Sequence, residues 1–230
     1  RERAKKAFLV KVEKLAPRSH PRLINAQGQV RASESVNLKA EVSGKIVWLS
    51  PSMVPGGRFK KGEALIRIDA RDYQLAVEQA EAVVQKQQLD LQLEKGRKRV
   101  AEREWELFKS GRPGGNAALA KREPQLRTAL LALRSSENSL AKAQLNLERT
   151  ILRAPFNGFV QSENVNVGEL LSPQAPAATL IGSDEYWVGV SLPLRNLAYI
   201  RAGITPATVT QEVGQNRIVK KGVALKILGS

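Results

Sequence analysis

The chain has 230 residues, of which 42% are hydrophobic and 26% charged, and its formal net charge is +15. It contains no cysteine, which excludes disulfides, thiol catalysis and cysteine-rich zinc sites. No run of 18 apolar residues is present, so the sequence predicts no membrane-spanning helix. No secretory leader opens the chain, as we expect of a mature or trimmed protein.

The positive charge is compatible with nucleic acid, an anionic membrane surface or plain solvation. Aromatic residues make up only 5% of the chain, whereas proteins that hold single-stranded nucleic acid rely on aromatic stacking platforms. The densest basic run, KGRKR at 95–99, lies among acidic residues in a helical pattern. We therefore expect a solvated helix face there and no nucleic-acid partner.

Strand patterns come first along the chain. Residues 7–15 alternate between apolar and polar side chains, which predicts a half-buried strand. Alternation returns at 35–42, and strand-like segments at 44–49 and 63–69 flank the turn-rich SPSMVPGG. Short strands with close turns and no helix predict a small β-sandwich or a fragment of a barrel.

From residue 72 to residue 150 the pattern is helical, with strong turn signals only in SGRPGGN at 110–116. Beyond that turn, one leucine recurs at every seventh position, a spacing typical of a coiled coil: Leu119, Leu126, Leu133, Leu140 and Leu147. The first half offers a looser seam of similar period: Leu89, Leu93, Gly96, Val100 and Leu107. The two halves predict an antiparallel helical hairpin, with Pro124 starting or kinking the second helix.

Strand patterns return from residue 153 to the end, interrupted by one short helix expected in LRNLAYIRAG. Because an antiparallel hairpin brings the chain back to where it left, residues near 71 and 151 are expected to be neighbours. The β segments on either side of the hairpin would then form two halves of one domain. Five glycines are predicted at its tight turns, with positive φ: Gly44, Gly57, Gly62, Gly158 and Gly168.

Two segments flanking the hairpin carry a family resemblance: VSGKIVWLSPSMVPGGRFKKGEALIRIDARDY and LERTILRAPFNGFVQSENVNVGELLSP. They resemble the periplasmic adaptor subunits (membrane fusion proteins, HlyD-like) of tripartite efflux pumps of the resistance-nodulation-division (RND) kind. The resemblance implies an elongated, nested α+β architecture. Its parts would be an incomplete β-barrel domain at 1–31 and 184–230, a lipoyl-like domain at 32–70 and 151–183, and a coiled-coil hairpin at 71–150.

The same resemblance implies a non-catalytic protein without a cofactor in the periplasm of a Gram-negative bacterium. Its partners would be an inner-membrane efflux transporter, a TolC-type outer-membrane channel and further copies of itself, as a trimer or hexamer. An N-terminal anchor outside this sequence would attach it to the inner membrane.

Adaptors of this family contact the channel through the hairpin tip, with an Arg, a Leu four residues later and a Ser seven beyond that. Arg103 and Leu107 match the first two positions. Position 114 is Gly rather than Ser, so the resemblance extends the candidate contact to Gly114, Gly115 and Asn116.

Two other functions fit parts of the pattern. An adaptor of an ABC-type exporter would share the same architecture. A lipoyl or biotinyl carrier would need a lysine presented at a β-turn, and SPSMVPGG contains none. An enzyme is disfavoured, since His20 is the only histidine and neither a catalytic triad nor a phosphate-binding loop can be assembled.

Overall fold

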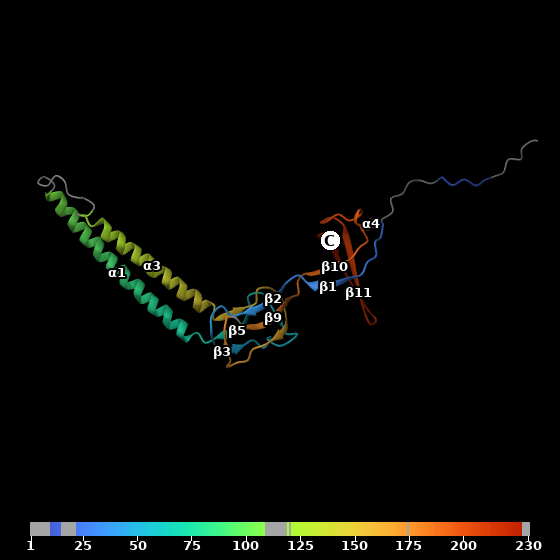
Figure 1. Cartoon of the computed structure of the whole chain (residues 1–230), viewed down its shortest axis with the longest axis horizontal. Coiled ribbons are helices and arrows are strands. Elements are labelled where there is room, and N and C mark those ends of the chain that lie inside the picture. Colours follow the sequence, from blue (N-terminus) through green and yellow to red (C-terminus); the bar gives the residue numbers. More distant parts are fainter. Residues whose placement is uncertain (1–9, 15–21, 109–118, 120, 174, 227–230) are drawn as a thin grey trace, which may run out of the picture. The chain divides into compact units, whose positions relative to one another are not determined.

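The structure is a computed structural model that describes residues 10–14, 22–108, 119, 121–173 and 175–226 (Figure 1). Contacts divide the chain into two compact units. One comprises Arg1–Val30 and Val188–Ser230, and the other comprises Arg31–Trp187.

The β part of the second unit consists of two four-stranded antiparallel sheets that share one core. The first has the order β2–β9–β7–β4, with bounds Ser35–Lys39, Pro176–Gly182, Gly158–Glu163 and Arg58–Phe59. The second has the order β6–β5–β3–β8, with bounds Ile151–Arg153, Ala64–Ile68, Gly44–Leu49 and Leu170–Leu171. Each sheet therefore contains two strands from before the hairpin and two from after it.

The core takes side chains from both sheets and from both halves of the sequence. Its most deeply buried aliphatic side chains include Ile46, Leu65 and Ile66 from before the hairpin, and Val160 and Leu180 from after it. Alternation along each strand sends these residues inward and their neighbours to solvent. Neither half alone holds a complete core.

The hairpin consists of α1 (Arg71–Phe108) and α3 (Glu123–Glu148), which lie side by side and run in opposite directions (Figure 1). At 1.5 Å per residue, α1 is about 57 Å long and α3 about 39 Å. At its base β5 pairs with β6, with Arg67 opposite Ile151. The expectation that the two ends of the hairpin are neighbours is therefore confirmed.

The remaining strands form two-stranded sheets. β1 (Gly28–Ala32) pairs with β10 (Tyr186–Val190), and β11 (Pro206–Val213) pairs with β12 (Asn216–Val223). The short helix α4, Leu194–Leu197, lies within the segment predicted to be helical.

The strand predicted at 7–15 is wrong where the structure describes it, because residues 10–14 are not in a strand. Val10 and Val12 are 76% and 89% exposed. Alternation in the sequence supplies the side-chain pattern of a strand, but it does not supply a neighbouring strand for the backbone to pair with.

The predicted turn glycines fall into two groups. Gly62 and Gly168 have positive φ, +82° and +96°, as expected. The prediction is wrong for the other three, which do not have positive φ: Gly44, Gly57 and Gly158. These positions need glycine because of close packing, and a Cβ at Gly158 would overlap the carbonyl oxygen of Ile181 on the paired strand.

Replacing Gly158 by Ala should therefore lower the free energy of unfolding by about 2–3 kcal/mol, because the added methyl group would push β7 away from β9. Gly96 in α1 is the matched control, since no atom lies within 4 Å of the position of its missing Cβ. Gly96→Ala should raise the free energy of unfolding by about 0.5–1 kcal/mol through helix propensity. Chemical denaturation of both variants tests the pair, and equal effects would contradict the packing argument.

Candidate functional site: the helical hairpin

The contact between the two helices follows a heptad on both sides. On α3, the sheltered positions include Leu126, Leu133, Leu140 and Leu147, with the small residues Ala129, Ser136 and Ala143 between them. On α1, the sheltered positions alternate in steps of four and three: Tyr73, Val77, Ala80, Val84, Gln87, Leu91, Glu94, Lys98, Ala101 and Trp105. This spacing is the one that knobs-into-holes packing requires.

The seam predicted for α1 is wrong. Leu89, Leu93, Val100 and Leu107 are 60%, 60%, 56% and 77% exposed. They have the same heptad spacing as the true seam but are displaced from it by two positions, onto the outward face of the helix. The true seam includes Gln87, Glu94 and Lys98, so selection by hydrophobicity alone favours the wrong stripe.

The base of the hairpin is attached to the β domain by polar contacts. The Tyr73 hydroxyl donates a hydrogen bond of 2.7 Å to the carbonyl of Ser43, and Arg149 forms an ion pair of 2.7 Å with Glu41. Asp69, just before α1, accepts hydrogen bonds from the Arg71 side chain, which lower the pKa of the Asp69 carboxyl to about 2. The first two contacts tie the helix ends at the base to the loop between β2 and β3, and the third lies between the end of β5 and the start of α1.

A second attachment holds the beginning of α3. Arg122 has the left-handed conformation (φ 57°, ψ 30°) and directly precedes the helix, in which Pro124 is the second residue. Its guanidinium donates two hydrogen bonds, of 2.7 and 3.1 Å, to the carboxylate of Glu94 on α1. The expected effect of Pro124 is confirmed, because α3 starts there rather than continuing through it.

The Glu94 carboxylate is 10% exposed and also lies 3.5 Å from Arg97. The hydrogen bonds from Arg122 favour its charged form and hold its pKa below the ordinary value of 4.5. The pair thus fixes the start of α3 against the middle of α1.

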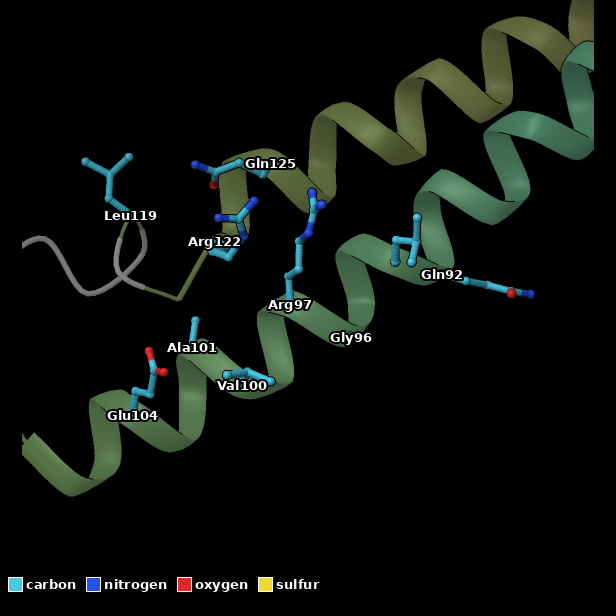
Figure 2. Close-up of a pocket in the computed structure, with 10 residues that line it drawn as sticks. Gln92, Gly96, Arg97, Val100, Ala101, Glu104, Leu119, Arg122 and Gln125 are labelled. Atoms are coloured by element: carbon cyan, nitrogen blue, oxygen red, sulfur yellow. The ribbon is translucent and has the colours of Figure 1, made fainter.

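An open groove of about 720 Å³ lies beside this pair. Figure 2 shows Gly96, Val100 and Glu104 along α1, with Leu119 and Arg122 on the opposite side. A second stretch of about 450 Å³ shares Leu93, Arg97 and Gln125 with the first, so the groove continues along the hairpin towards its base.

Some of the residues predicted to contact a channel lie in the described part of the chain, and others do not. Arg103 and Leu107 are exposed near the end of α1, with Leu107 77% exposed. Leu119, predicted as the first leucine of the seam rather than as a channel contact, is 56% exposed and precedes α3. Gly114, Gly115 and Asn116 lie outside the described residues.

Two kinds of feature are absent from the described residues. Neither long helix, in the part of the chain that the structure covers, has an apolar stretch able to cross a bilayer. Among the same residues, no three His, Asp or Glu side chains gather into a group that could hold a metal ion.

Lowering the pH should remove the contribution of the Glu94–Arg122 pair. Since the pKa of Glu94 is lowered in the folded state, the stabilisation is complete above about pH 4.5 and is lost as the pH falls through the folded-state pKa. Wild type should therefore have a higher Tm than Glu94→Gln at pH 7, and the difference should shrink as the pH is lowered below 4.5. A difference in Tm that does not change over this range would contradict the assignment. Glu78→Gln on the same helix, at an exposed position, is the control.

No protein-family model matches the chain. Its fold is similar to those of several solved structures. They include an efflux-transporter candidate from Bacteroides eggerthii (TM-score 0.60, 21% identity, 84% of this chain) and a MacA–MexA chimera with the Pseudomonas aeruginosa MexA α-hairpin (0.57, 21%, 85%). A third is the membrane fusion protein Spr0693 from Streptococcus pneumoniae R6 (0.57, 18%, 84%). This chain spans 53%, 64% and 82% of their respective lengths, and it has the fold that they share.

Proposed function

We propose that the chain is an adaptor of a tripartite efflux pump, which links an inner-membrane transporter to an outer-membrane channel and catalyses no reaction. The observation that carries the proposal is the long antiparallel hairpin inserted into a split, two-sheet β domain. The similarity in fold to solved membrane fusion proteins supports it. The proposed location is the periplasm of a Gram-negative bacterium, at the inner membrane.

The finer assignments belong to the same proposal. The two-sheet unit would be the lipoyl-like domain (32–70 and 151–183), and residues 1–31 with 184–230 would belong to a β-barrel domain. Residues 71–150 would form the coiled-coil rod. The transporter would be of the RND kind, and several copies of the chain would assemble around the transport path.

The hairpin is suited to hold two partners at a fixed separation. Its base is attached to the β domain through Tyr73 and Arg149, and its second helix is fixed to its first by the Glu94–Arg122 pair. Two helices packed along a heptad seam resist bending better than a single helix does. A displacement of the β domain would therefore be passed to the far end of α1, where Arg103 and Leu107 are exposed.

A photo-crosslinking side chain at position 107, in the full chain in its host cell, should give an adduct with an outer-membrane channel. The matched control is position 75, another exposed leucine of α1 that lies 32 residues nearer the base, about 48 Å away. Position 75 should give no channel adduct. A result with no channel adduct at 107, or with equal yields at both positions, would contradict the docking assignment.

Co-purification identifies the inner-membrane partner. Recovery of an RND transporter with the full chain is the expected result. Recovery of an ABC-type exporter instead would keep the adaptor function and overturn the RND assignment.

A further inference from the structure

The outward face of α1 carries a second heptad stripe. Its members, which we call the outer stripe, are Leu89, Leu93, Gly96, Val100, Arg103 and Leu107, in steps of four and three. Its four large apolar side chains are 56–77% exposed, in the part of the chain that the structure describes. A helix with apolar stripes on two faces can pack against a helix on each of them, and α3 covers only the inner one.

Charges beside the outer stripe change sign along the helix. In heptad terms, Arg99 and Glu106 occupy the same flanking position one repeat apart. Arg97 and Glu104 repeat this order on the other flank, beside the groove. Each flank is thus basic in its middle and acidic towards the end of α1.

This order of charges distinguishes between two ways of pairing α1 with α1 of a second copy. Parallel, in-register pairing would bring Arg99 beside Glu104 of the other copy but would place no acidic side chain beside Arg97, which would meet Gln92. Antiparallel pairing with Leu107 opposite Gly96 would place Arg99 beside Glu106 of the other copy, and the two-fold axis would repeat the contact. The antiparallel register would also place Arg97 beside Glu104 of the other copy, so it pairs opposite charges on both flanks, whereas parallel pairing does so only for Arg99 and Glu104. Charge complementarity therefore favours the antiparallel arrangement.

The same register also suits the packing. Open space surrounds the position of the missing Cβ of Gly96, so a large side chain can approach the helix backbone there. Leu107 is 77% exposed, and in a two-fold pair the Leu107 side chain of each copy would occupy the space over Gly96 of the other copy. We propose that the outer stripe of α1 is a self-association surface, on which a second copy of this chain packs antiparallel with Leu107 over Gly96.

This pairing has a consequence for docking. Arg103 and Leu107 lie within the contact, and they are the two described residues assigned above to the channel. A self-paired hairpin therefore cannot present them to a channel, and the antiparallel pair is a resting form that separates before docking. The self-association itself does not depend on the channel assignment, and the tests below use the purified full chain alone.

Cysteine cross-linking tests the register, since the chain has no cysteine of its own. Gly96→Cys and Leu107→Cys should form a mixed disulfide when the two variants are combined under oxidising conditions. Neither should form a disulfide with its own kind, because identical positions would be offset by 11 residues, about 16 Å, beyond disulfide reach. Leu75→Cys, an exposed control on the same helix, should form a disulfide with neither.

Disulfides between identical variants would show parallel pairing and overturn the proposal. So would the absence of a mixed disulfide, or equal yields with the Leu75→Cys control.

Charge exchange provides an independent readout by analytical ultracentrifugation. Arg99→Glu alone and Glu106→Arg alone should each weaken dimerisation by about tenfold or more, because like charges then meet twice. Mixing the two variants should restore dimerisation to near the wild-type level, since opposite charges meet again in the mixed dimer. Dimerisation that neither variant changes, or that mixing fails to restore, would overturn the pairing.

Discussion

The fold depends on the pairing of β5 with β6, the two strands that flank the helical hairpin. Arg67 lies opposite Ile151 and Ala64 opposite Arg153, although 84 and 89 positions separate them in the numbering of the chain. Only a hairpin that returns to its origin can close this pair. Each large side chain in the shared core contributes about 1.5–3 kcal/mol when fully buried, and the core draws on both sides of the hairpin. The core of the β domain is therefore complete only when the chain returns from the hairpin.

The two faces of α1 carry different kinds of side chain. Its inner face holds α3 through a seam that is partly polar, with Glu94 balanced by Arg122 and Lys98 lying 3.5 Å from Glu102. Its outer face keeps the larger aliphatic side chains exposed. The aliphatic side chains of the outer face are therefore free of contact with α3 for most of their surface. Proteins that bind helices use such stripes at heptad spacing.

Much of the fold could be predicted from the sequence. The heptad leucines of the second helix, the turn signals at 110–116 and the return of strand patterns after 153 were sufficient to place a hairpin between two β segments. Local patterns could not decide which of two equal stripes on α1 faces its partner. The distinction involves Glu94, a charged residue of the inner seam whose carboxylate accepts hydrogen bonds from Arg122, just before α3. The hydrophobic periodicity of the sequence does not indicate such an ion pair.

The glycines show a similar limit of prediction from local sequence. A positive φ at Gly62 and Gly168 follows from ordinary turn chemistry. The requirement at Gly158 comes from a carbonyl on β9, a strand that lies beyond a loop and is brought close only by the sheet. The candidate docking residues Arg103 and Leu107 could be found only through family resemblance, because nothing in their local pattern separates a docking leucine from a seam leucine.

The central claim, that the chain doubles back to join β5 to β6, is tested most directly by a disulfide across that pair. In the double variant Ala64→Cys and Arg153→Cys, the two positions face each other in the register, and the chain offers no competing thiol. A disulfide within one chain should form readily and raise the Tm, since it closes a long loop in the unfolded state. Free thiols after oxidation, or cross-links only between chains, would contradict the claim.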